Sequence, residues 1–204
     1  NVVGAKLGQE AIATSLKAGA IGFGILMVFM IALYLLPGVA AILALILYVD
    51  LTVCLIAAFE VTLTLPGIAG VILAVGMAVD ANVIIFTRIK EEIGLGHSTK
   101  QAINAGFQKA LSAIVDGNVT TIIAAVVLYL RGSGTVKGFA STLALGIILS
   151  MITALFVTRF IMNCFYSIGL EGEKLYGKKV DKKPIQFLQK RKIFCAISAI
   201  MIVI

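Results

Sequence analysis

Two aspartates interrupt apolar stretches of the sequence, and each is followed two residues later by an asparagine. Asp80 precedes Asn82, and Asp116 precedes Asn118, in the shared pattern Val-Asp-small-Asn-Val. The two aspartates are 36 residues apart. Inside a membrane, a carboxylate near the centre of a helix costs about 2.5–3.5 kcal/mol, so such a residue usually faces other helices or a hydrated cavity. These four residues are therefore the first candidates for chemistry.

Two interpretations of these polar pairs are open. In the first, the Asp and Asn side chains hydrogen-bond across helices and only hold the bundle together. In the second, burial raises the pKa of a carboxyl group, so that it takes up and releases a proton near neutral pH. A carboxyl group that alternates between two protonation states can couple the passage of protons to a movement of helices. The twinned pattern favours this second interpretation.

The two Asp-Asn units are expected at a similar depth in neighbouring helices. Asp80 lies 8 residues before Arg88, and Asp116 lies 7 residues after Lys109. At 1.5 Å per residue, these separations place the aspartates about 12 and 10.5 Å from the inner boundary of the membrane. The units are thus placed to pair, to share a proton or to line one polar pocket.

Other charged residues are weaker candidates. Glu60 ends an apolar run and is expected at the membrane interface. Asp50 is central in its run but has no matching partner in the sequence, and its role stays open. Residues 88–92 are expected to form a solvated helical extension, and His97 is expected in a loop without a functional role.

The composition excludes an ordinary soluble domain. Of the 204 residues, 60% are hydrophobic and 13% are charged, against roughly 45–50% and 25% in soluble domains. A disordered chain is excluded as well, because it would be poor in apolar residues. With one histidine, three widely spaced cysteines and no nucleophile elbow or phosphate-binding loop, we expect no metal, no cofactor and no catalytic activity.

Long apolar runs divide the chain into predicted membrane helices. A run of about 20 apolar residues forms a helix long enough to cross a ~30 Å hydrocarbon core. Five such helices are predicted, at residues 18–36, 39–60, 66–87, 110–130 and 138–165. Ser98 is expected to cap a short amphipathic helix before the fourth of them. The predicted fold class is an all-α membrane protein, a polytopic bundle of five transmembrane helices, with the start of a sixth helix at 193–204.

Basic residues predict the orientation of this bundle. When the predicted helices alternate in direction, 13 of the 17 Lys and Arg residues fall on one side of the membrane and 4 on the other. Cytoplasmic loops are rich in Lys and Arg, so the side with 13 is expected to be cytoplasmic and the first helix to run inward. Topology and contact with anionic membrane lipids explain the net charge of +7, and no binding of nucleic acid is expected.

Small residues recur every four positions in three of the predicted helices. These ridges consist of Gly70, Ala74 and Ala78; of Ala113, Gly117, Thr121 and Ala125; and of Thr142, Gly146, Ser150 and Ala154. In lipid, ridges of small residues let helix backbones approach closely. They predict how the helices pack but indicate no function by themselves.

Several segments, taken in order, resemble a known family. LTLPGIAG at residues 63–70, GMAVDANV at 76–83 and RIKEE at 88–92 resemble SecD, the accessory membrane subunit of the bacterial Sec protein-export machinery. DGNVTT at 116–121, KGFA at 137–140 and SMITA at 150–154 are similar to further segments of the same family. The resemblance covers about residues 5–165 and implies membership of the resistance-nodulation-division (RND) superfamily of proton-driven membrane proteins.

The tail carries a second, shorter similarity. KPIQF at residues 183–187 and KRKIF at 190–194 are similar to the start of SecF, the partner subunit that is fused to SecD in some bacteria. The resemblance implies four parts of a fused chain. They are the end of an extracytoplasmic domain or its connector at 1–17, a SecD-type bundle at 18–165, a basic cytoplasmic linker at 166–192 and the first helix of a SecF-like part from 193.

The resemblance also implies a function in the bacterial cytoplasmic (inner) membrane. The family uses the proton motive force to promote export of preproteins through the SecYEG channel, after the step driven by SecA and together with SecF. Asp80 matches the proton-coupling aspartate of the family, and Asn82, Asp116, Asn118 and Thr120 match positions that shape its surroundings. An RND exporter of small molecules or lipids, and a structural scaffold for the translocon, are the alternatives.

Overall fold

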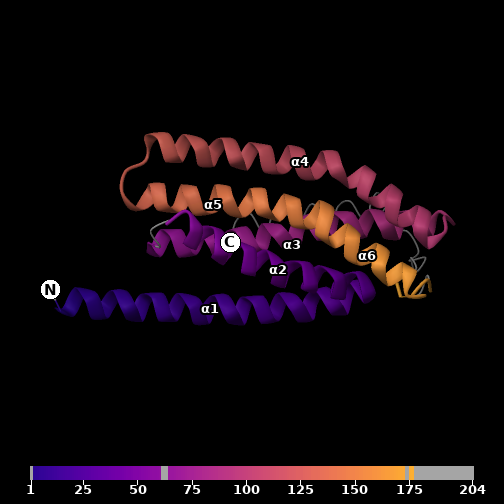
Figure 1. Cartoon of the computed structure of the whole chain (residues 1–204), viewed down its shortest axis with the longest axis horizontal. Helices are drawn as coiled ribbons and strands as arrows, with labels where there is room; N and C mark the ends of the chain where they lie inside the picture. The colour runs from indigo at the N-terminus through magenta and orange to yellow at the C-terminus, as the bar shows by residue number, and fades with distance from the viewer. Residues whose placement is uncertain (1, 61–63, 173–174, 177–204) are drawn as a thin grey trace, which may run out of the picture.

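The computed structural model describes residues 2–60, 64–172 and 175–176, and within this part of the chain every regular element is a helix (Figure 1). The first three helices are α1 (Val2–Tyr34), α2 (Leu36–Ala58) and α3 (Leu65–Gly94). They are followed by α4 (Thr99–Arg131), α5 (Thr135–Ile152), a π-helical segment η1 (Thr153–Val157) and α6 (Thr158–Ser167). The last three elements form one continuous helical rod.

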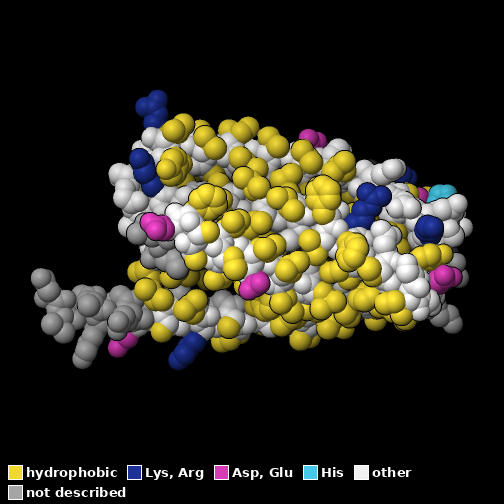
Figure 2. All heavy atoms as spheres, in the orientation of Figure 1, with side chains coloured by type: hydrophobic (Ala, Val, Ile, Leu, Met, Phe, Trp, Pro, Cys, Tyr) yellow, Lys and Arg dark blue, Asp and Glu magenta, His cyan; other side chains and the backbone are white. Residues whose placement is uncertain are grey.

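Five stretches of these helices are long and apolar enough to cross a membrane. They are Glu10–Tyr34, Leu36–Ala58, Leu65–Gly94, Thr99–Arg131 and Thr135–Ser167. On the face shown in Figure 2, hydrophobic side chains cover most of the surface, whereas Lys and Arg side chains gather toward its ends. The chain is a multi-pass membrane protein, and the predicted all-α transmembrane bundle is confirmed.

The helices extend beyond the predicted apolar runs. α1 has 33 residues and is about 50 Å long, well beyond the thickness of a hydrocarbon core. No separate amphipathic helix follows Ser98. Instead, Ser98 and Gln101 form a capping box that starts α4, which continues without a break to Arg131 because no proline interrupts this stretch. Most of the predicted linker at 166–192 and the whole predicted helix at 193–204 lie outside the described residues.

The centre of the bundle is α3, which packs most extensively against α5 and α4. Two of the predicted small-residue ridges meet there. A Cβ atom added to Gly146 would lie 2.5 Å from the Ala74 Cβ, and one added to Gly70 would lie 2.6 Å from the Thr142 hydroxyl oxygen. The Thr142 hydroxyl donates a hydrogen bond across the contact to the Gly67 carbonyl, at 3.1 Å. Small side chains therefore set the distance between α3 and α5.

At the predicted cytoplasmic end, charged side chains of α3 tie helices together. The Glu92 carboxylate is buried and lies 2.6 Å from the Lys109 Nζ and 2.9 Å from the His97 Nδ1. Lys90 donates a hydrogen bond to the Leu33 carbonyl at the end of α1, at 2.6 Å. The expectation that residues 88–92 form a solvated extension is wrong for Glu92, which is buried, whereas His97 lies exposed in the loop where it was expected. Gly106, about one helical turn before Lys109 on α4, packs tightly against α3. The Glu92 carboxylate therefore lies between α3 and α4.

Candidate functional site

Asp80 lines a groove of about 200 Å³ between α3 and α4. The two helices run antiparallel (Figure 1) and pack against each other. The Asp80 side chain is exposed on the bundle surface, so its carboxyl group is open to whatever lies against this face. The groove is lined by Met77, Asp80, Ala81 and Ile84 from α3 and by Ala113, Ile114, Gly117, Asn118 and Thr121 from α4.

Helical periodicity explains why these residues share one groove. Those of α3 recur at i, i+3, i+4 and i+7. On α4, Ile114, Gly117, Asn118 and Thr121 follow the same spacing and Ala113 lies four residues before Gly117, so each set forms one face of its helix. Gly117 faces open space in this groove, since no heavy atom lies within 4 Å of a Cβ added there. The ridge that contains Gly117, unlike the other two small-residue ridges, leaves space beside an acidic side chain.

Asn82 faces away from Asp80, into the bundle. Residues two positions apart in a helix are rotated by about 200°, so the two side chains cannot share a face. Asn82 is buried, and its Oδ1 accepts a hydrogen bond from the Thr158 hydroxyl at 2.9 Å, while its Nδ2 donates to the Ala78 carbonyl at 3.3 Å. Asn82 therefore joins α3 to the helix that follows η1.

The partner of Asn82 lies at the end of the π-turn. The backbone N–H of Thr158 donates to the carbonyl of Thr153, five residues earlier, which is the hydrogen bond that defines a π-helix. The Thr158 hydroxyl is also 3.3 Å from the same carbonyl. π-Turns of this kind are frequent at functional sites. Thr158 lies in a segment that is similar to the family, but neither this turn nor the hydrogen bond to Asn82 was predicted from the sequence.

The predicted polar residues of α4 divide into two groups. Asn118 is half-buried, lines the groove and donates to the Ile114 carbonyl at 2.7 Å. Asp116 and Thr120 are exposed and do not line it, and the Thr120 hydroxyl donates to the Gly117 carbonyl at 2.9 Å. The sequence left open whether the two Asp-Asn units pair, share a proton or line one pocket. In the structure, Asp80 and Asn118 line one groove and Asp116 does not. Thr121, four residues after Gly117, lines the groove and was missed.

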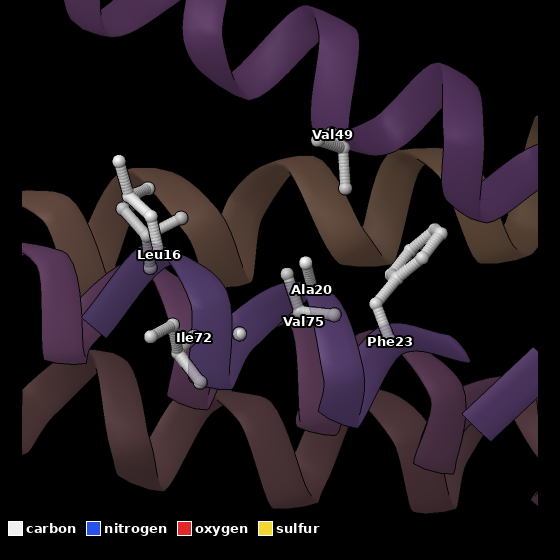
Figure 3. Close-up of a pocket in the computed structure, with 8 residues that line it drawn as sticks. Leu16, Ala20, Phe23, Val49, Ile72 and Val75 are labelled. Carbon is white, nitrogen blue, oxygen red and sulfur yellow. The ribbon is translucent and has the colours of Figure 1, made fainter. Parts of the chain in front are cut away.

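A second pocket, of about 330 Å³, lies between α1, α2 and α3 and contains no charged side chain (Figure 3). Figure 3 shows its lining of Leu16, Ala20 and Phe23 from α1, Val49 from α2, and Ile72 and Val75 from α3. An apolar pocket of this kind offers no group for proton transfer. Among the described residues, no cluster of His, Cys, Asp and Glu could hold a metal ion. The groove at Asp80 is thus the better candidate site.

Comparison with known protein families decides where this chain belongs. Residues 1–167 match the family described as "Protein export membrane protein SecD/SecF, C-terminal". The chain belongs to the SecD/SecF family. The resemblance of the motifs around Asp80 and Asp116 is confirmed at the level of the family.

Individual relatives of the SecD/SecF family agree with this assignment. Protein translocase subunit SecD of Acidaminococcus fermentans is 47% identical over 185 residues, which cover 91% of this chain and 42% of the relative. Protein translocase subunit SecDF of Bacillus subtilis is 44% identical over 191 residues, or 92% of this chain and 25% of the relative. The chain therefore spans less than half the length of these relatives.

A solved structure of the SecD/SecF family has the same fold. It is the crystal structure of SecDF, a translocon-associated membrane protein, from Thermus thermophilus, with a TM-score of 0.84 and 33% sequence identity. The match covers 96% of this chain and 27% of the solved one. The helical bundle described above is thus the architecture of a SecDF membrane region.

The groove predicts a contrast between small and large substitutions at Gly117. Replacing Gly117 by alanine adds a methyl group to open space and should leave the stability of the full-length protein unchanged or slightly raised. Replacing it by leucine fills the groove beside Asp80. If the proton-driven export that the family resemblance implies depends on this groove, the leucine variant should show reduced export while the protein stays folded. Export and circular-dichroism melting of both variants, measured in parallel, test this. Equal export by the two variants would contradict a role for the groove.

The hydrogen bond between Thr158 and Asn82 predicts a second pair of variants. Thr158→Val removes the hydroxyl at nearly constant volume and should destabilise the full-length protein by about 0.6–2 kcal/mol, the range for hydrogen bonds between membrane helices. Thr158→Ser keeps the donor and should retain most of the stability. Thermal unfolding of the purified proteins in detergent measures the difference. Identical melting of the two variants would show that the hydrogen bond contributes nothing.

Proposed function

We propose that this chain forms the SecD-type membrane bundle of a Sec translocase subunit, which uses the proton motive force to promote export of preproteins across the bacterial cytoplasmic membrane. One observation carries the proposal. Asp80, an acid within a membrane-spanning helix, opens into a groove between two helices of a SecD/SecF-family bundle. In this proposal the protein acts without enzymatic catalysis.

In this proposal, proton uptake by Asp80 changes how tightly the helices around the groove pack. An ionised carboxylate in this position needs water or a hydrogen-bond donor, because apolar surroundings penalise its charge. When Asp80 takes up a proton, that penalty falls and the groove can close against a neighbouring helix. Asn118 and Thr121 supply polar atoms on the opposite wall. Asp80 is then the proton-coupling residue, and Asn118 shapes its surroundings.

Asn82 gives a route from the groove to the rest of the bundle. It stands two residues after Asp80 and is hydrogen-bonded to Thr158 at the end of the π-turn. A movement of α3 that follows a change of charge at Asp80 acts on this hydrogen bond directly. Thr120 and Asp116, which face outward, are positioned to contact a neighbouring helix outside the described bundle.

The partners follow from the relatives. One of them is a fused SecDF, and we propose SecF, fused or separate, as the partner of this bundle, with the SecYEG channel and substrates driven by SecA as the machinery that it assists. In that arrangement residues 1–17 connect to an extracytoplasmic domain. Residues 18–165 form the bundle, 166–192 a cytoplasmic linker and 193–204 the start of a SecF-like helix.

The test uses the full-length protein in inverted membrane vesicles that contain the Sec channel and its ATPase. Export of a preprotein is measured with a proton gradient and after the gradient is collapsed by a protonophore. The proposal expects the full-length protein to increase export only when the gradient is present. An equal increase under both conditions would reject proton coupling and leave a structural role in the translocon.

A further inference from the structure

The outward face of α2 carries an acidic residue within the membrane. Asp50 lies 14 residues after Leu36 and 8 residues before Ala58, the two ends of the helix. These separations correspond to about 21 and 12 Å, so the residue is inside a hydrocarbon core of about 30 Å. Its side chain is exposed, and no described residue forms a hydrogen bond or an ion pair with it.

The surroundings of Asp50 offer no partner for its carboxyl group. Its neighbours one helical turn away on the same face are Ile46, Leu47, Val53 and Cys54, and all four are exposed. The aspartate side chain is too short to reach the interface across about 12 Å. Lipid tails supply no hydrogen-bond donor, and an acid in this position is expected to pair with another polar group. Within the described bundle, the structure therefore gives Asp50 no bonded partner.

The shape of this face suits a closely packed helix. Asp50, Cys54 and Ala58 recur every four residues along the outer half of α2, and all are exposed. Such a ridge of small residues lets another helix backbone approach. The exposed face of α1 is different, because Ile21, Ile25 and Val28, at 65–70% exposure, present the bulky apolar surface typical of contact with lipid. The α2 face thus lets another helix approach closely, and it carries the Asp50 carboxyl group, which has no bonded partner among the described residues.

We propose that the Asp50–Cys54–Ala58 ridge is the docking surface for a membrane-spanning helix that carries a lysine or arginine level with Asp50. The two side chains form an ion pair inside the membrane. Charge complementarity selects this occupant, since a purely apolar helix would leave the carboxylate without a donor. The pair lies on α2, apart from the groove between α3 and α4. The proposal is independent of proton coupling at Asp80.

One base within the described residues needs a separate control. Lys17 on α1 lies 17 residues before Tyr34 and so reaches a depth close to that of Asp50. The structure records no ion pair between the two, and the Lys17 side chain is exposed. Crosslinking and charge exchange distinguish Lys17 from a base on a partner helix.

The first experiment uses the native cysteine of the ridge. In the full-length protein in its own membrane, Cys54 is kept as the single cysteine of this chain (C164A, C195A) and labelled with a maleimide-benzophenone probe. After photolysis, mass spectrometry is expected to find the probe attached to a membrane-spanning peptide with Lys or Arg within about one helical turn of the attachment site. A matched control carries C54A and I25C, whose probe should react mainly with lipid. Equal products from both positions, or a peptide without a base there, would overturn the proposal.

The second experiment tests the ion pair by charge exchange. Asp50→Asn, which is neutral and of equal size, should lower the crosslinking yield from Cys54 several-fold with no loss of folded protein. Asp50→Lys should lower it further, by about tenfold, as expected for two like charges in a medium of low dielectric constant. Changing the identified base to aspartate should then restore the yield. Restoration by Lys17→Asp instead, or by neither change, would show that the partner is not the proposed helix.

Discussion

Replacing Asp80 by asparagine in the full-length protein should abolish the proposed gradient-dependent part of preprotein export and leave the bundle folded. Asparagine has nearly the same shape as aspartate, but it neither takes up nor releases a proton. Because Asp80 is exposed in a groove, the change removes no buried contact, and the stability should stay within about 0.5 kcal/mol of the original. Export in inverted vesicles should fall to the level measured without a proton gradient.

A matched control is available on the neighbouring helix. Asp116 is predicted at a similar depth and is also exposed, but it does not line the groove. Asp116→Asn removes the same charge and should retain most of the gradient-dependent export. Asp80→Glu keeps a titratable carboxyl group and should retain part of it. If Asp80→Asn and Asp116→Asn lower export equally, the groove does not define the proton site.

Replacing Gly146 by alanine produces the largest expected loss of stability. The added Cβ atom would lie 2.5 Å from the Ala74 Cβ and 3.0 Å from the Tyr48 hydroxyl oxygen. Neither neighbour can move easily, since one is attached directly to the α3 backbone and the other belongs to a fully buried side chain. Overpacking of this kind costs about 1–3 kcal/mol. The thermal midpoint of the purified full-length protein should fall by several degrees.

Gly117→Ala is the control for this second result. The two substitutions add the same methyl group to a glycine within a membrane helix, but the Gly117 methyl enters open space. The higher helix propensity of alanine, up to about 1 kcal/mol, therefore acts at Gly117 without opposition. Melting followed by circular dichroism should separate the two variants clearly. Similar melting temperatures would mean that α3 and α5 are less closely packed than the structure indicates.

The sequence predicted the bundle because a membrane imposes simple rules on composition. Apolar runs near 20 residues, broken at Pro37 and Pro66, were sufficient to find the membrane helices. Small residues at every fourth position predicted close packing between helices, which Gly146 and Gly70 confirm for α3 and α5. The boundaries were less accurate, because helices extend beyond the lipid when nothing in the sequence stops them. α4 continues from Thr99 to Arg131 for this reason.

The sequence named candidate residues for the groove but not the directions in which their side chains point. The repeated Asp-Asn pattern indicated a common depth, whereas helical phase decides which side chains meet. Asp80 faces the groove, whereas Asn82 faces the core. Asn118, and not Asp116, lines the groove together with Asp80. The bond from Asn82 to Thr158 joins residues 76 positions apart, and no local pattern announces such a pairing. The burial of Glu92 was not predicted, because the residues around it in the sequence are charged. Its ion-pair partner Lys109 lies 17 positions away, on the next helix.

The π-turn of η1 also affects how the length of this part of the gene can change. A π-turn holds one residue more than the α-helical turn that it replaces. Deleting one residue within 153–157 would close it to an α-helical turn and leave the residues beyond it in nearly the same helical phase. Deleting one residue between Thr135 and Ile152 would instead rotate everything beyond it by about 100°. Thr158 would then leave Asn82, and the buried side chain of Met162 would turn out of the core. The π-turn is thus the part of this helical rod where a single-residue deletion preserves the contacts on both sides.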